Sequence, residues 1–237
     1  MVFSDTSGNL GIVQQTRSLM RVDATLWPTY KIVNSCNNWL DYVIGYGIAQ
    51  DKFLQMDDTN HTDLSEGTSD LTISVADYSF LTDQQSNKIV TLLGVSILSG
   101  GYYRPLTPID RNDPSLDMST FGQVSGTPTQ YDKISDNIIR LDKIPTATVS
   151  AGLKYYFQRA GSYFAATDTT KQPGVAPILH RGFVVASAYD GALTLGLENL
   201  QPLSIEKEKE IQVLREYFGT RNNDQPRRIV SMYQNNR

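Results

Sequence analysis

The side chains that could do chemistry in this sequence are few, and their spacing matches no catalytic motif. The two histidines, His61 and His180, lie far apart, one in a polar loop and one at the start of a predicted helix. A serine nucleophile of the hydrolase type needs a G-x-S-x-G turn, which the sequence lacks. The single cysteine, Cys36, is expected to fill a small gap in the core. We therefore expect no enzymatic activity and no cofactor.

The acidic segment MDDTNHTDLSEG (56–67) is the one candidate for a metal site. Asp58, Asn60 and Thr62 alternate as calcium ligands do, but the segment lacks the sixth-position glycine and twelfth-position glutamate of an EF-hand loop. Asp and Asn side chains in loops also accept hydrogen bonds from nearby backbone N–H groups. We expect this capping role, and we predict no metal site.

The C-terminal segment combines basic and apolar side chains without a helical period. Residues 219–237 contain four arginines against one aspartate. A disordered end is one interpretation, and an extended segment that becomes ordered on a partner, through main-chain pairing and side-chain pockets, is the one we favour. The residues expected to dock are Arg221, Pro226, Arg227, Arg228, Ile229, Met232 and Tyr233.

Composition excludes several classes of protein. The chain has 237 residues, of which 40% are hydrophobic and 19% charged, as in ordinary globular proteins. Its net charge of −4 argues against a surface that coats nucleic acid. No apolar run approaches the ~18 residues of a membrane span, and no secretory signal is recognisable, so we expect synthesis in the cytoplasm and no membrane partner.

The secondary structure predicted from the sequence begins and ends with helices. Residues 1–23 are polar with isolated hydrophobic side chains and are predicted to form an arm. Helical spacing of apolar residues predicts a helix from Leu26 to Leu54, with Asp23 as its cap and a break near Asn37 and Asn38.

The second helical region is expected over residues 175–218, with Pro177 in its first turn. Ser204 is expected to cap the last helix and Gly219 to end it, so that an extended tail starts at residue 219. Three further glycines are expected to let a neighbouring helix approach closely: Gly182, Gly191 and Gly196.

The middle of the chain has the pattern of an antiparallel β-domain. Short runs of β-branched and aromatic residues are joined by turns such as Ser99-Gly100-Gly101 and Ser135-Asp136-Asn137, and residues 111–128 form a long loop. The predicted fold is α+β, a helical bundle (24–57 and 175–218) with an inserted antiparallel β-domain (58–174). The predicted strands are 71–75, 77–81, 88–98, 102–106, 131–134, 138–141 and 148–159.

Three segments of the sequence resemble a known family. FLQMDDTNHTDLSEGTSDLTISVADYSF (53–80), GTPTQYDKISDNIIRLDKIPTATVSAGLKYYFQR (126–159) and VLREYFGTRNNDQPRRI (213–229) look like the head-to-tail adaptor, or connector, proteins of tailed bacteriophages. The resemblance is to those in which a helical part carries a β-domain. It covers about residues 25–230, rests on turns and strands, and leaves the first twenty residues unmatched.

The resemblance implies a structural protein of the virion neck. It implies a homo-oligomeric ring, twelvefold in such adaptors, that contacts adjacent subunits, the portal protein and a downstream tail or neck protein. DNA would pass through its channel without sequence-specific binding, and the C-terminal segment would reach into the portal. The acidic body agrees with such a channel, because residues 1–200 hold 20 acidic against 14 basic side chains.

A second class of function stays open. A β-sandwich module of a phage tail that binds carbohydrate or a receptor would use exposed tyrosines, for which Tyr102, Tyr103, Tyr155 and Tyr156 are candidates. In the competing interpretation these tyrosines alternate between the two faces of a sheet and belong partly to its core.

Overall fold

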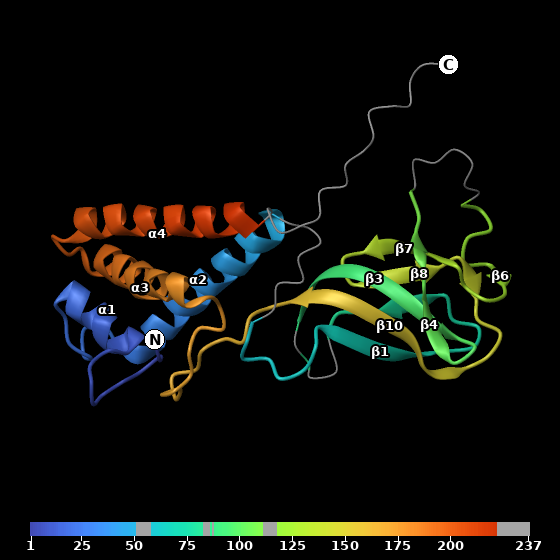
Figure 1. Ribbon diagram of the computed structural model, residues 1–237, viewed down its shortest axis with the longest axis horizontal. Coiled ribbons are helices and arrows are strands. Elements are labelled where there is room, and N and C mark those ends of the chain that lie inside the picture. Colours follow the sequence, from blue (N-terminus) through green and yellow to red (C-terminus); the bar gives the residue numbers. More distant parts are fainter. Residues whose placement is uncertain (51–57, 83–85, 87, 111–117, 222–237) are drawn as a thin grey trace, which may run out of the picture. The chain divides into compact units, whose positions relative to one another are not determined.

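The chain folds into two compact units, and each is described by itself. The computed structural model describes residues 1–50, 58–82, 86, 88–110 and 118–221 (Figure 1). The helical unit comprises Met1–Leu54 and Tyr163–Arg237, and the β unit is Gln55–Ser162. The helices therefore come from both ends of the chain and the strands from its middle, which confirms the predicted α+β class.

Helix α3 is the centre of the helical unit. It packs against each of the other three α-helices (Figure 1). Consecutive residues 182–188 of α3 are all buried, so every side of this helix is covered, as expected for a central helix. The helical elements are α1 (Ile12–Met20), α2 (Thr29–Gln50), the 3-10 turn η1 (Pro177–Leu179), α3 (His180–Leu195) and α4 (Leu200–Arg221).

Two glycines of α3 let its neighbours approach closely, as predicted. A Cβ atom at Gly182 would lie 2.7 Å from Nε1 of Trp39 in α2. One at Gly191 would lie 2.9 Å from the ring of Trp27 and closer still to the Met20 side chain. Gly196 differs, because it ends α3 in the left-handed conformation at φ +64° and nothing lies within 4 Å of its Cβ position. Its predicted packing role is wrong.

The N-terminal residues belong to the helical unit, so the prediction of an arm over residues 1–23 is wrong. Helix α1 packs on α3 and buries Ile12, Val13 and Met20. Phe3 is fully buried, and its ring stacks on that of Phe164 at a centroid distance of 4.8 Å. A helix of nine residues offers too few turns for its apolar spacing to stand out among polar neighbours.

Helix α2 is continuous, so the break predicted near Asn37 and Asn38 is wrong. The Asn37 side chain is used in hydrogen bonds outside the helix, and buried Trp39 and Leu40 hold this turn against the rest of the unit. Asp23 accepts hydrogen bonds from two backbone N–H groups in the turn that precedes α2. It caps that turn and not the helix itself.

The second helical region has two further differences from its prediction. Pro177 occupies the first turn of η1, as predicted. Helix α4 begins at Leu200, so Ser204 lies inside the helix and does not cap it. The predicted β-domain includes residues 163–174, but these residues belong to the helical unit, where the Phe164 ring packs between Phe3 and Phe183.

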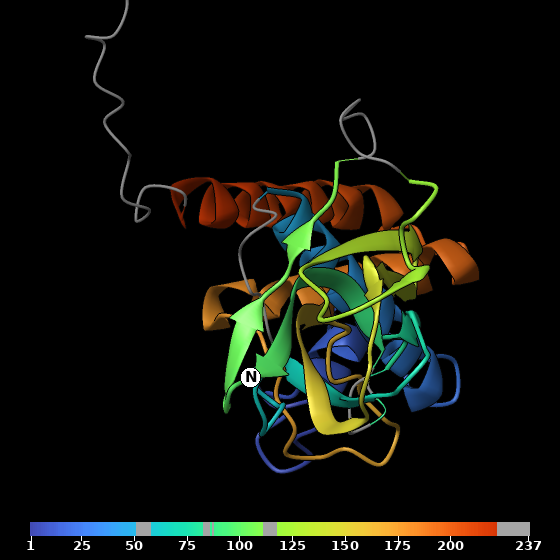
Figure 2. The ribbon, with the colours of Figure 1, turned by 90° about the vertical axis from the view of Figure 1, so that its right-hand side faces the viewer.

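Two four-stranded sheets and one two-stranded sheet, of β6 and β9, form the β unit (Figures 1 and 2). The first has the order β1-β10-β3-β4 and is antiparallel throughout, and the second has the order β2-β8-β7-β5. Only short pairs, β5 with β7 and β6 with β9, are parallel among the described strands. The strands are β1 (Glu66–Leu71), β2 (Asp77–Ser79), β3 (Ile89–Ser99), β4 (Tyr102–Pro105), β5 (Thr107–Pro108), β6 (Val124–Ser125), β7 (Gln130–Ser135), β8 (Ile138–Leu141), β9 (Lys143–Ile144) and β10 (Val149–Arg159).

Tight turns join the strands where the sequence predicts them. Gly100 and Gly101, both at positive φ, connect β3 to β4, and Ser99 pairs with Tyr102 across this turn. Two such residues in a row are typical of the hairpin turns that match strand twist. The turn between β7 and β8 is equally short, since Ser135 pairs with Ile138.

The strand predicted over 71–75 is wrong, because β1 ends at Leu71 and a turn follows. The hydroxyl of Tyr78 stabilises this turn. It accepts from the backbone N–H of Thr72 at 3.0 Å and lies within hydrogen-bonding distance of the carbonyl oxygens of Thr72 and Val75. These local bonds override the strand preference of Ile73 and Val75, which are exposed.

The two large sheets share one apolar core. Residues that face inward from β10 and β3, among them Leu153, Phe157 and Val95, cluster with Ile139 and Leu141 from β8. Along β10, Leu153, Tyr155 and Phe157 point into this core, so Lys154 and Tyr156 lie on the outer face of the sheet. The core therefore fixes which side chains the first sheet presents outward.

Candidate functional site

The C-terminal docking residues lie almost entirely outside the described part of the chain. Arg221 is the last residue of α4. The other six docking residues follow the last described residue of the chain: Pro226, Arg227, Arg228, Ile229, Met232 and Tyr233. The predicted start of an extended tail at residue 219 is wrong, because α4 continues through Gly219 to Arg221.

Tertiary packing explains why α4 continues past Gly219. Leu214 and Phe218 are buried, and the Phe218 ring lies 6.0 Å from that of Tyr46 in α2. This contact anchors the last turns of the helix and offsets the ~1 kcal/mol that a glycine costs in a helix. The segment 222–237 therefore follows directly on an anchored helix.

The two histidines lie in different units and each bonds a backbone carbonyl oxygen. Nε2 of His61 is 3.1 Å from the oxygen of Ala160 in the β unit. Nε2 of His180 is 2.9 Å from the oxygen of Val175, so this nitrogen carries the proton. Burial lowers the pKa of His180, which keeps its imidazole neutral at pH 7. Both contacts position the chain.

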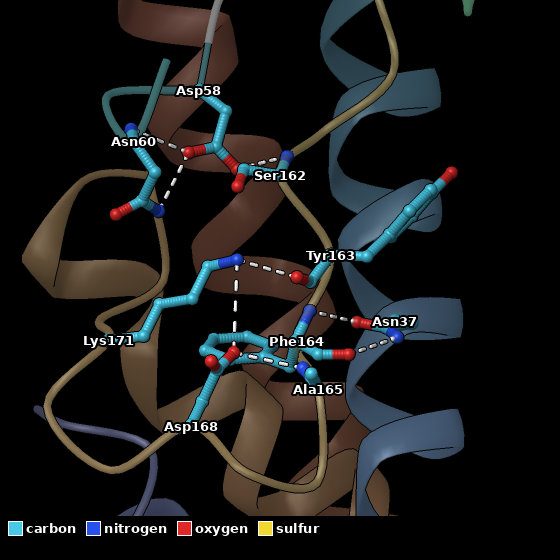
Figure 3. A network of polar contacts seen from close by, with 9 residues as sticks. All are labelled: Asn37, Asp58, Asn60, Ser162, Tyr163, Phe164, Ala165, Asp168 and Lys171. Atoms are coloured by element: carbon cyan, nitrogen blue, oxygen red, sulfur yellow. Dashed lines mark hydrogen bonds and ion pairs between the residues drawn. The ribbon is translucent and has the colours of Figure 1, made fainter. Parts of the chain in front are cut away.

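The capping role predicted for the acidic loop is confirmed at Asp58 (Figure 3). Its buried carboxylate accepts from the backbone N–H of Asn60 at 2.9 Å, from the Asn60 side chain at 2.8 Å and from the backbone N–H of Ser162 at 2.9 Å. Both oxygens thus hold backbone groups. Thr62 is exposed, and within the described ranges no three His, Cys, Asp or Glu residues are placed to hold a metal ion.

A second set of bonds holds the chain where it re-enters the helical unit (Figure 3). The Asn37 side chain donates to the carbonyl oxygen of Phe164 at 3.1 Å and accepts from its N–H at 2.8 Å. The Tyr163 hydroxyl donates to the carboxylate of Asp41 at 2.7 Å. Burial and this carboxylate raise the pKa of Tyr163 to about 12. These groups are structural.

The four candidate tyrosines do not form one surface. Tyr155 lies in the core, where its hydroxyl is 2.8 Å from that of Ser69 and burial raises its pKa to about 12. Tyr156 follows it on the outer face. Tyr102 is 59% exposed and packs with Arg104 on its own strand. The interpretation that these residues alternate between the two faces of a sheet is thus confirmed along β10.

The outer face of the first sheet carries a hollow of about 430 Å³. Lys154 lines this hollow, with Nζ 2.9 Å from Oε1 of Glu66 and within 5.5 Å of the ring centroids of Tyr103 and Tyr156. The bond to Glu66 raises the pKa of Lys154, so the amine stays protonated. We call this feature the outer hollow; its lining residues are Asp63, Leu64, Glu66, Gly67, Thr68, Tyr103 and Lys154.

Sequence reasoning identified Tyr103 as a candidate but missed Asp63, Glu66 and Lys154. Glu66 and Thr68 are two residues apart in β1 and so lie on the same face of the strand. This spacing is the sequence pattern that could have identified them. The prediction misses this pattern because it starts the strand at residue 71, after Glu66 and Thr68. Lys154 lies opposite Thr68, a pairing that depends on strand register and cannot be seen within either segment alone.

Comparison with known proteins adds no relative. No protein-family model matches the chain, and no curated protein is significantly similar to it. In the described part of the chain, none of the helices has the length and apolarity that a membrane crossing requires.

Proposed function

We propose that this chain is a structural protein of a tailed-bacteriophage virion, a head-to-tail adaptor. In this proposal it forms a ring with further copies of itself, joins the portal to the downstream tail or neck protein, and lines the channel through which DNA passes. It has no enzymatic activity and no cofactor. The observation that carries the proposal is the insertion of a β unit between helices from both ends of the chain, since the resembling adaptors also carry a β-domain on a helical part.

The distribution of charge supports a channel role. The β unit, residues 55–162, holds 13 acidic and 8 basic side chains, a net charge of −5. The remaining residues hold 12 acidic and 13 basic side chains, a net charge of +1. An acidic wall repels the phosphate backbone and lets a duplex slide past without holding it. Repetition around a ring would multiply this field.

The C-terminal segment is the proposed portal-binding element. Helix α4 is anchored up to its last turns by Leu214 and Phe218, so the segment that follows starts from a fixed point. Arg227 and Arg228 would pair with acidic groups of the portal, while Ile229, Met232 and Tyr233 would fill apolar pockets. Ordering costs ~1–2 kcal/mol per residue, which a partner surface must offset, and many copies in one ring raise the overall avidity.

A truncation after Arg221 tests this docking role and keeps α4 whole. We expect the chain 1–221 to fold and to lose binding to portal rings of the same phage, measured by co-sedimentation. Arg227→Ala with Arg228→Ala should weaken binding at least tenfold, because each Arg–carboxylate pair contributes through charge-assisted hydrogen bonds.

The matched control removes the same charge from the exposed face of α4. Lys209→Ala with Arg215→Ala should change portal affinity less than twofold, since both side chains are exposed on the body. Undiminished binding by the chain 1–221 would contradict the docking role. If both double variants lost the same portal affinity, Arg227 and Arg228 would contribute only through net charge and not through specific pairs.

A further inference from the structure

The outer hollow is built from side chains that other residues hold in place. Tyr103 belongs to β4, and its hydroxyl donates to the carbonyl oxygen of Ala151 in β10 at 2.8 Å. Because β3 lies between these strands, the Tyr103 side chain crosses β3 and is fixed at both ends. Its ring therefore forms a rigid apolar wall, which loses little conformational entropy when a ligand packs on it.

The two carboxylates of the hollow are fixed as well. Oδ2 of Asp63 accepts from Nη1 of the buried Arg159 at 3.0 Å, and Oε1 of Glu66 accepts from Lys154 at 2.9 Å. In these described contacts each cation uses one oxygen of its carboxylate. The other oxygen, Oδ1 of Asp63 or Oε2 of Glu66, remains as an acceptor for a donor group of a ligand.

Charge decides which class of ligand fits. Each carboxylate of the hollow is paired with a cation, Asp63 with the buried Arg159 and Glu66 with Lys154. A cationic ligand would compete with cations that already pair with these carboxylates, and an anionic ligand would meet two carboxylates. A neutral molecule with several hydroxyl groups gains charge-assisted hydrogen bonds from the same carboxylates at no electrostatic cost.

From these observations we propose that the outer hollow binds a neutral saccharide, whose apolar ring face packs on Tyr103 and whose hydroxyl groups donate to Asp63 and Glu66. The volume of about 430 Å³ lies within the range of small-ligand sites, about 300–1,000 Å³. The hollow lies on an exposed sheet face, so we expect modest affinity, with a Kd on the order of 1–10 mM for a single sugar ring. This inference is independent of the proposed neck role.

Ligand-observed NMR on the full chain tests the proposal with a panel of neutral mono- and disaccharides. We expect saturable binding of at least one member with a Kd below ~10 mM. Tyr103→Ala should weaken it at least tenfold, and Tyr103→Phe, which keeps the ring, should stay within threefold. Tyr102→Ala is the matched control, because Tyr102 is exposed on the same strand but does not line the hollow, and it should have no effect beyond twofold.

Three results would overturn the proposal. The first is the absence of saturable binding by any neutral saccharide up to ~20 mM, since a site of this size should reach that affinity. The second is an equal effect of Tyr103→Phe, Tyr103→Ala and Tyr102→Ala. The third comes from comparing glucosamine with N-acetylglucosamine: tenfold tighter binding of the cationic sugar would identify a cation site in place of a neutral-saccharide site.

Discussion

The interiors of the two units are packed in different ways. In the helical unit, small residues of α3 let large side chains approach, so that Trp39 packs directly over Gly182. In the β unit, large apolar side chains from two sheets fill the core, and a fully buried cation, Arg159, lies at its margin with Asp63. The ion pairs of Arg181 with Glu206 and Glu210 lie at the surface of the helical unit.

Substitutions should therefore destabilise the two units for different physical reasons. The helical unit has no room for an added side chain at Gly182 of α3. The β unit contains a buried charged side chain, Arg159, that is stabilised by its ion pair with Asp63. Packing faults and lost partners carry different free-energy costs. Substitutions of each kind, placed in each unit, therefore separate the two ways of packing.

The largest effect is expected from Asp63→Ala in the β unit. Arg159 has a side-chain exposure of 0% and Asp63 one of 28%, and loss of the carboxylate removes this ion pair from a buried guanidinium. We expect a loss of about 3 kcal/mol, the lower end of the range for a broken buried pair, because Arg159 keeps its bond to the Asp63 carbonyl oxygen. Amide hydrogen exchange of β3 and β10 measures it.

The control for this variant is Asp136→Ala, which removes the same charge from an exposed turn of the same unit. Its effect on exchange should stay within about 0.5 kcal/mol, as is usual for surface substitutions. Equal losses in Asp63→Ala and Asp136→Ala would show that the buried ion pair does not stabilise the β unit.

An intermediate effect is expected from Gly182→Ala in the helical unit. The added methyl would lie 2.7–2.9 Å from three atoms of the rigid Trp39 ring, and overpacking of this kind costs about 1–3 kcal/mol. The same substitution at Gly45, an exposed position of α2 with nothing within 4 Å of its Cβ position, should stabilise the unit by up to ~1 kcal/mol. Urea unfolding measures both, and effects of the same sign would contradict the packing interpretation.

The smallest effect is expected from the surface pair of Asp77 and Arg140 in the β unit. The two bonds are 2.7 and 2.8 Å long, but the side chains are 44% and 43% exposed, so Asp77→Asn should cost only about 0.2–1 kcal/mol at pH 7.

The cost of Asp77→Asn should also depend on pH. The hydrogen bond from Arg140 lowers the pKa of Asp77 below its ordinary 3.8. A lowered folded-state pKa means that the stabilisation is present above pH ~4 and is lost as the pH falls through the folded-state pKa. Urea unfolding of both proteins at pH 7 and at pH 2 tests this, and a pH-independent difference would exclude the ion pair as its cause.

The sequence predicted the parts of the fold that local signals determine. Gly100 and Gly101 predict a hairpin because its turn needs residues at positive φ, which glycine adopts readily. The long helices α2 and α3 have enough turns for the helical spacing of their apolar residues to be recognised. Helix α1 has too few turns. Strand β1 reads EGTSDL, with Gly67 and Ser69 facing inward, so it lacks the apolar alternation of a recognisable strand.

The outer hollow could not be predicted because its parts meet only through strand pairing. Glu66, Tyr103 and Lys154 come from three different strands. The register in which distant strands pair cannot be predicted from the sequence of one strand. The docking residues of the C-terminal segment, in contrast, were selected on composition and stay a prediction. In the docking proposal, the surface that they bind belongs to a partner protein, which this sequence does not contain.

Electron microscopy of the full chain mixed with portal rings of the same phage tests the central proposal most directly. The adaptor proposal predicts a ring of this protein stacked coaxially on the portal, with density for residues 222–237 entering portal pockets. The same mixture made with the chain 1–221 should show bare portals. Bare portals with the full chain, at concentrations well above those of the rings, would contradict the assignment of this protein to the head-to-tail junction.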